Sequence, residues 1–167
     1  MSADSQELVS LAQRLRQQSR FADARAAAER ALEIAPDHAE AWFNLGAALA
    51  GLERVEAAEA AYRRALEYQP RYAEAWSNLG GLLGAKGAID EQMTAYRRAI
   101  DANPRLAPVW SNLGNALCSA RRFAEADSAC RRAIELDSGT HRKEAHRFYF
   151  RERMAITAFH FIRRLDA

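Results

Sequence analysis

Tryptophan recurs in this sequence at a fixed interval of 34 residues, at Trp42, Trp76 and Trp110. Each tryptophan stands in nearly the same phrase, which reads AEAWFNLG, then AEAWSNLG, then APVWSNLG. An interval of this length is typical of one helix–turn–helix unit in a helical solenoid. The interval therefore predicts an all-α repeat fold, and it directs the search for function to a binding surface rather than to a catalytic pocket.

Counting each tryptophan as position 4 divides the chain into four units, which are residues 5–38, 39–72, 73–106 and 107–140. Positions 7 and 11 are leucine in every unit, position 8 is glycine or alanine, and position 27 is alanine. Because positions 4, 7, 8 and 11 share one face of a helix, we expect them to be buried against the second helix of the unit. Proline at position 32 of the first three units disfavours a helical residue before it, so the second helix should end there.

These spaced positions resemble the tetratricopeptide repeat (TPR) family over residues 5–140. The resemblance implies an α-solenoid of four TPR helix–turn–helix repeats. The first unit departs from the pattern with Ala12 and Ala28, and the fourth with Cys130, as expected for the terminal units of an array. Gln92 replaces the alanine of position 20 in the third unit, and nothing in the sequence explains it.

Polar side chains recur on the side of each first helix that should face away from the second helix. The candidate peptide-contacting amides and hydroxyl occupy positions 6 and 9 and are Ser10, Gln13, Asn44, Asn78, Asn112 and Asn115. An amide side chain can hold both the N–H and the C=O of one extended peptide unit. Solenoid helices pack roughly 8–10 Å apart and an extended peptide rises about 3.3 Å per residue, so one asparagine per unit would hold about every third ligand residue. We therefore predict an extended peptide in the concave groove of the solenoid.

The asparagine row resembles the superhelical TPR domain of the O-linked N-acetylglucosamine transferases, where asparagine at this repeat position holds the substrate backbone. The resemblance implies the same role for Asn44, Asn78 and Asn112, whereas Ser10 interrupts the row in the first unit. The alternative is that these asparagines are ordinary polar surface residues. Phe43 lies on the same helical face, where it is either an apolar anchor for the ligand or a packing residue against a neighbouring repeat.

The charge distribution argues against two other kinds of ligand. Positions 2, 5 and 6 hold no basic residue, and Glu40 and Glu74 would repel a carboxylate, so binding of acidic C-terminal tails is disfavoured. The formal net charge is only +2, and arginines of the second helices stand four residues before acids, which favours surface ion pairs over a nucleic-acid-binding stripe. The expected ion pairs are Arg63–Glu67, Arg97–Asp101 and Arg131–Glu135.

The segment 141–167 lacks the repeat pattern and is predicted to form one long helix. Its first expected role is to cap the last repeat. It is more apolar than a cap requires, so it is also a candidate for self-association or for contact with a further domain of a longer ancestral protein. The candidate self-association residues are Phe148, Phe150, Met154, Phe159, Phe161 and Ile162.

Motifs for catalysis are absent from the sequence: we find no glycine-rich phosphate loop, no HExxH and no paired cysteine motif. Two cysteines are too few for a metal site, and no segment is apolar enough to span a membrane. We therefore expect a single cytoplasmic domain over 1–167 that is no enzyme and needs no cofactor, metal, nucleic acid, membrane or small-molecule substrate. The expected function is a non-catalytic adaptor that binds an extended protein segment. The alternatives are a self-assembling scaffold and the substrate-recruiting part of a transferase.

Overall fold

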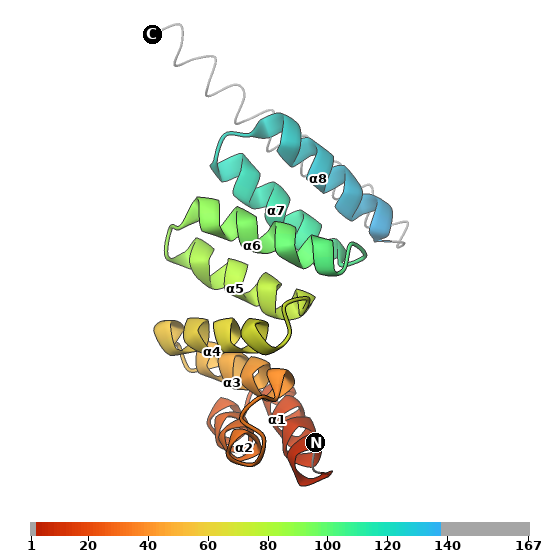
Figure 1. The fold of residues 1–167 in the computed structure, drawn as a ribbon. Coiled ribbons are helices and arrows are strands. Elements are labelled where there is room, and N and C mark those ends of the chain that lie inside the picture. Colours follow the sequence, from red (N-terminus) through yellow and green to blue (C-terminus); the bar gives the residue numbers. More distant parts are fainter. Residues whose placement is uncertain (1–2, 138–167) are drawn as a thin grey trace, which may run out of the picture.

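The computed structural model describes residues 3–137, which form eight α-helices (Figure 1). Each predicted unit contains a first helix and a second helix, joined by a short turn. The helices are α1 (Ala3–Gln17), α2 (Phe21–Ile34), α3 (Ala39–Gly51), α4 (Val55–Tyr68), α5 (Ala73–Ala85), α6 (Ile89–Ala102), α7 (Ala107–Ser119) and α8 (Phe123–Leu136).

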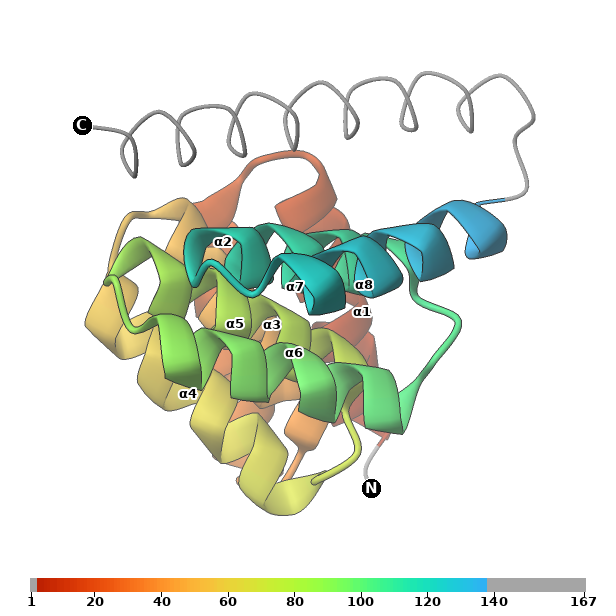
Figure 2. The ribbon, with the colours of Figure 1, turned by 90° about the horizontal axis from the view of Figure 1, so that it is seen from above.

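Consecutive helices pack as antiparallel hairpins, and the hairpins stack one after another along the array (Figures 1 and 2). Within each repeat the two helices make the most extensive contacts, and the second helix of each repeat then packs on the first helix of the next. This arrangement confirms the predicted all-α fold with four TPR hairpins. The predicted C-terminal helix 141–167, with its candidate self-association residues, lies outside the described residues.

The turn inside each hairpin uses one left-handed residue, always at position 15. These residues have φ values near 60° to 80° and are Ser19, Glu53, Gly87 and Arg121. The next residue donates its backbone N–H to the carbonyl of the leucine at position 11, as Ala88 does to Leu83 at 2.9 Å. This six-to-one bond closes the first helix in the manner of a Schellman motif. Only the third repeat places glycine where the left-handed conformation favours it.

The recurring tryptophans link each repeat to the one before it. Each indole Nε1–H donates to the carbonyl of the position-32 proline in the preceding loop, at 2.7 Å for Trp42 and Pro36 and at 2.9 Å for Trp76 and Pro70. Trp110 repeats the contact with Pro104 at 2.9 Å. The tryptophans are half-buried rather than fully buried, because the edge that carries the N–H reaches the loop.

Small residues of the first helix admit large residues of the second helix. A Cβ added at Gly46 would lie 2.8 Å from the ring of Tyr62, and one at Gly80 would lie 2.7 Å from the ring of Tyr96. The first repeat avoids the conflict by pairing Ala12 with Ala28, both fully buried. The glycine and the tyrosine are therefore one packing unit, in which the missing Cβ makes room for the ring.

Gln92, which the sequence left unexplained, also packs into space that a small residue of the first helix leaves open. A Cβ at Gly84 would collide with the Gln92 amide nitrogen, so the amide occupies the space that a larger residue at position 12 would fill. Burial raises the pKa of Tyr96, and the Gln92 side chain opposes this rise. The polar side chain at position 20 therefore fits because glycine at position 12 leaves space for it beside the tyrosine of position 24.

The leucine of position 7 packs on the preceding repeat as well as on its own. Leu45 lies in one cluster with Ala27 and Ala28 of α2, and Leu79 lies in a cluster with Tyr62 and Leu66 of α4. The first repeat has no predecessor, and its position-7 residue, Leu11, is 37% exposed. The expectation that position 7 is buried in every repeat is therefore wrong for Leu11.

No helix within 3–137 is long and apolar enough to cross a membrane.

Candidate peptide-binding site

The first helices α1, α3, α5 and α7 carry the predicted peptide contacts at positions 5, 6, 9, 12 and 13, which we call the A-helix face. The three predicted asparagines differ sharply on this face. Asn44 is 1% exposed and donates from Nδ2 to the backbone carbonyl of Glu40 at 3.0 Å. Asn78 is half-buried and donates to the Tyr62 hydroxyl at 3.2 Å, whereas Asn112 is exposed.

The packing of the first helices explains this gradient. Helix α1 packs directly against α3, whereas the corresponding pairs α3 with α5 and α5 with α7 make far less contact. Helix α3 is therefore enclosed between α1, α2 and α4, and position 6 of the second repeat becomes an interior position. The prediction that Asn44 faces an open groove is wrong.

The other predicted polar contacts are on the surface. Ser10, Gln13 and Asn115 are exposed, and the Ser10 hydroxyl donates to the backbone carbonyl of Gln6 at 2.9 Å. The side chains of Gln13, Asn112 and Asn115 form no hydrogen bond with any residue in 3–137. The structure therefore leaves the amides of the first and last repeats available to a ligand, and it engages those of the second and third repeats internally.

Phe43 belongs to an aromatic cluster and is 8% exposed. Its ring centroid lies 5.9 Å from that of Tyr62 and 4.9 Å from that of Tyr72, in tilted arrangements that favour aromatic pairs. Because Tyr62 and Tyr72 flank it within the fold, Phe43 is a packing residue. Of the two interpretations of Phe43, the structure supports packing rather than an exposed anchor.

Arg16 covers this aromatic cluster, and the sequence analysis did not select it. Its guanidinium carbon lies 5.6 Å from the centroid of the Phe43 ring, a cation–π geometry that contributes on the order of 1 kcal/mol. The Arg16 Nε is buried and has no hydrogen-bond partner. Position 12 holds alanine, glycine or cysteine in the other repeats. Arg16 is the one charged residue at this position, and this exception could have marked it as a candidate site residue from the sequence.

The pKa values of Tyr72 and Tyr62 depend on burial and on the charges around the aromatic cluster. Burial raises the pKa of Tyr72 well above its usual value, the carboxylates of Glu40 and Glu74 raise it further, and the Arg16 charge opposes the rise. Burial also raises the pKa of Tyr62, against the hydrogen bond from Asn78 and the Arg16 charge. Both hydroxyls therefore stay protonated at neutral pH and remain able to donate hydrogen bonds.

Arginines on the second helices form ion pairs, but not with the predicted acids. The observed pairs are Arg63–Glu59, Arg63–Glu91, Arg97–Glu125 and Arg131–Asp127. The predicted partners Glu67 and Glu135 instead pair with Arg64 and Arg132, three residues before each. The predicted pairing was wrong because an acid four residues before an arginine, or in the next repeat, is as close as one four residues after it.

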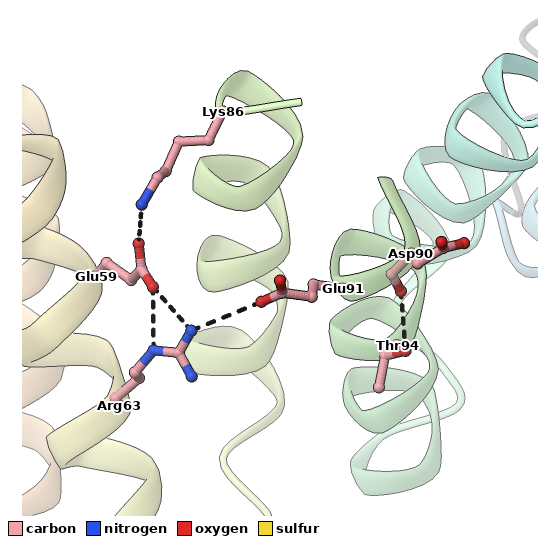
Figure 3. A network of polar contacts seen from close by, with 6 residues as sticks. All are labelled: Glu59, Arg63, Lys86, Asp90, Glu91 and Thr94. Atoms are coloured by element: carbon pink, nitrogen blue, oxygen red, sulfur yellow. Dashed lines mark hydrogen bonds and ion pairs between the residues drawn. The ribbon is translucent and has the colours of Figure 1, made fainter. Parts of the chain in front are cut away.

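One of these networks joins the second repeat to the third (Figure 3). Glu59 accepts from Lys86 Nζ at 2.8 Å and from Arg63 at 2.8 Å, and Arg63 also lies 3.9 Å from Glu91. The hydrogen bonds from Lys86 and Arg63 hold the pKa of Glu59 below its usual value. Because Lys86 and Arg63 are already paired with carboxylates of the protein, these basic side chains are unsuited to binding phosphate.

Within 3–137 no group of histidine, cysteine, aspartate or glutamate side chains is arranged to hold a metal ion. Cys130 is buried in the slot that tyrosine fills in the middle repeats, and burial is the main cause that raises its pKa to about 12. A thiol with so high a pKa is a poor nucleophile at neutral pH.

Comparison with known proteins supports the assignment of the fold. The MamA crystal structure aligns with a TM-score of 0.73 and 24% identity, over 80% of this chain and 78% of MamA. A structure of PilF from Pseudomonas aeruginosa aligns with a TM-score of 0.79 and 22% identity, over 95% of this chain and 73% of PilF. Likeness at this identity shows a shared fold. No curated protein matches the sequence.

Family models for the tetratricopeptide repeat match most of the described chain. One matches residues 9–67 and again 48–107, and a second matches residues 111–136. The matches span the same repeats that the tryptophan interval predicts. The chain belongs to the tetratricopeptide repeat family.

Proposed function

We propose that this protein is a non-catalytic interaction module that holds an extended segment of a partner protein along its A-helix face. TPR domains are typically protein-interaction modules. One observation carries the proposal for this chain: Gln13, Asn112 and Asn115 are exposed on that face and form no hydrogen bond with any residue of 3–137. Exposed amides on packed helices suit the backbone of an extended peptide, because each supplies donors and an acceptor.

The burial of Asn44 supports a smaller set of asparagines for the proposed contact. Asn112 and Asn115 are one helical turn apart on α7, and Asn78 offers its amide oxygen while its nitrogen donates to Tyr62. Asn44 is excluded from direct contact while α1 covers it. The likeness to transferase TPR domains therefore rests on Asn78 and Asn112. The cytoplasmic location stays a prediction that cell fractionation would test.

A displayed library of random peptides tests the proposal on the intact chain. We expect the wild-type protein to enrich a family of peptides, and the Asn112→Ala/Asn115→Ala variant to bind them at least about tenfold more weakly, a loss of about 1.4 kcal/mol. Far-UV circular dichroism and thermal melting should be unchanged, because both residues are exposed.

The matched control is Arg98→Ala/Ser128→Ala, which truncates two exposed residues of the second helices α6 and α8. This control should bind the enriched peptides as the wild type does. If no peptide is enriched, or if the asparagine variant binds unchanged, the A-helix face is not a peptide site of this kind.

A further inference from the structure

Arg16 differs from every other cation in the described chain. Each of the other arginines and the lysine in residues 3–137 is exposed, whereas Arg16 is half-buried. Nine of these exposed cations are in ion pairs with acids, yet the Arg16 side chain forms no ion pair and no hydrogen bond with any residue of 3–137. A charged group taken out of water without a counter-ion is unfavourable, so this position requires an explanation.

The fold holds the Arg16 side chain in place without neutralising it. The Phe43 ring supports the guanidinium at 5.6 Å, and Phe43 is itself fixed between Tyr62 and Tyr72. The Nε–H of Arg16 is buried with no acceptor. A guanidinium has its N–H donors in one rigid plane that matches the two oxygens of a carboxylate. The fold thus presents an immobilised donor set that lacks its acceptor.

A second unsatisfied polar atom lies on the adjacent helix. The Oδ1 of Asn44 is buried without a donor, and Asn44 follows Phe43 directly in α3. Helix α1, which carries Arg16, packs against α3. Two unsatisfied polar atoms therefore occur on the two first helices that pack together, although most buried polar atoms in native proteins have a hydrogen-bond partner.

The surrounding charges restrict what can occupy this site. The charges of Glu40 and Glu74 raise the pKa of Tyr72 and the charge of Arg16 lowers it, so two acids and one base lie close enough to act on one ring of the aromatic cluster. Neither of these glutamates forms an ion pair within 3–137. The two glutamates would repel an acidic segment, which is why acidic C-terminal tails are disfavoured. Arg16 lies at position 12, outside positions 2, 5 and 6, and can pair with one carboxylate, whereas neutral or basic flanking residues suit the two glutamates.

We infer that Arg16 and the Phe43–Tyr62–Tyr72 cluster form a specificity site for one aspartate or glutamate side chain in an extended partner segment whose flanking residues are neutral or basic. This inference rests on the proposed function and adds a side-chain requirement to it. Backbone contact through amides accepts many sequences, and the Arg16 site would select among them.

The peptide library distinguishes this inference from the proposed function. Wild-type protein should enrich peptides that share one acidic position, and Arg16→Gln should enrich peptides without that preference. The control Arg14→Gln removes an exposed arginine two residues away and should keep the acidic preference. If wild-type protein enriches no peptides, both proposals fail. If it enriches peptides with no acidic preference, or if Arg16→Gln keeps that preference, only the Arg16 inference is overturned.

A change in the peptide keeps the test independent of protein folding. Replacing the shared acid of an enriched peptide with its amide should weaken binding to wild-type protein about tenfold or more, and should leave binding to Arg16→Gln unchanged. Fluorescence anisotropy measures all four combinations. Equal loss on both proteins would place the peptide carboxylate elsewhere and would overturn the assignment to Arg16.

Discussion

Two adjacent glycines in α5 should respond in opposite ways to the same substitution. A Cβ added at Gly81 would meet no atom within 4 Å, because this residue lies on the exposed A-helix face. A Cβ added at Gly80 would lie 2.7 Å and 2.9 Å from two ring carbons of Tyr96, which is only 4% exposed. Both substitutions remove the same entropic disadvantage of glycine in a helix interior.

The magnitudes follow from these two environments. Alanine is favoured over glycine in a helix interior by about 1 kcal/mol, so Gly81→Ala should stabilise the protein by about that amount. Overpacking a buried site costs about 1–3 kcal/mol, and the short distances at Gly80 favour the upper end. Gly80→Ala should therefore destabilise by about 2 kcal/mol, since about 1 kcal/mol of helix propensity offsets a cost of about 3 kcal/mol.

The first repeat suggests the variant that should relieve the conflict. Ala12 and Ala28 occupy its positions 8 and 24, where the third repeat has Gly80 and Tyr96. In a Tyr96→Ala background, Gly80→Ala should become stabilising by about 1 kcal/mol, like Gly81→Ala. The coupling energy between the two sites should accordingly be about 3 kcal/mol.

Urea unfolding followed by far-UV circular dichroism measures the four variants of this cycle together with Gly81→Ala. Repeat arrays can unfold in steps, so tryptophan fluorescence should be followed in parallel to test for a single transition. Equal stability of Gly80→Ala and Gly81→Ala, or a penalty for Gly80→Ala that persists without the Tyr96 ring, would refute the packing argument.

Two further predictions concern buried polar groups. Asn44→Asp places a carboxylate at a site that is 1% exposed and should lower the free energy of unfolding by about 3 kcal/mol or more. The control Asn112→Asp, at the same repeat position but exposed, should change it by less than about 0.5 kcal/mol. Similar melting temperatures for the two variants would contradict the burial of Asn44. The lowered pKa of Glu59 implies stability that is present above its unfolded value of 4.5 and is lost as the pH falls through the lower folded value. Wild-type protein should therefore exceed Glu59→Gln in stability by up to about 1 kcal/mol near neutral pH, with a difference that shrinks on acidification; a constant difference would refute the role of the Glu59 charge.

The fold could be predicted from the sequence because repetition averages out local ambiguity. A single AEAWFNLG phrase is only a helical segment, but three similar phrases, each 34 residues from the next, set the register of every helix. Trp76 and Pro70 recur together because the indole N–H donates to the proline carbonyl, a contact within one short stretch of chain. The pair Gly80 with Tyr96 likewise recurs as Gly46 with Tyr62, because the two middle hairpins build the same contact.

The site could be predicted only in part, because it depends on how far apart the first helices lie. Position 6 has the same local surroundings in each repeat, yet Asn44 is interior and Asn112 is exposed. The difference comes from the close packing of α1 on α3, which the later repeats do not reproduce. Arg16 was overlooked for the same reason, since its contact with Phe43 crosses from the first repeat to the second.

This variation along the array divides the A-helix face into two chemically different parts. The first three repeats contribute Arg16, the aromatic cluster of the second repeat, and Glu40 and Glu74, whereas α7 contributes the exposed amides of Asn112 and Asn115. A partner segment held as proposed would be recognised by charge near its one end and by its backbone near the other. Because these two kinds of contact are not interchangeable, the segment would bind in one direction, although the repeats themselves are nearly equivalent in sequence.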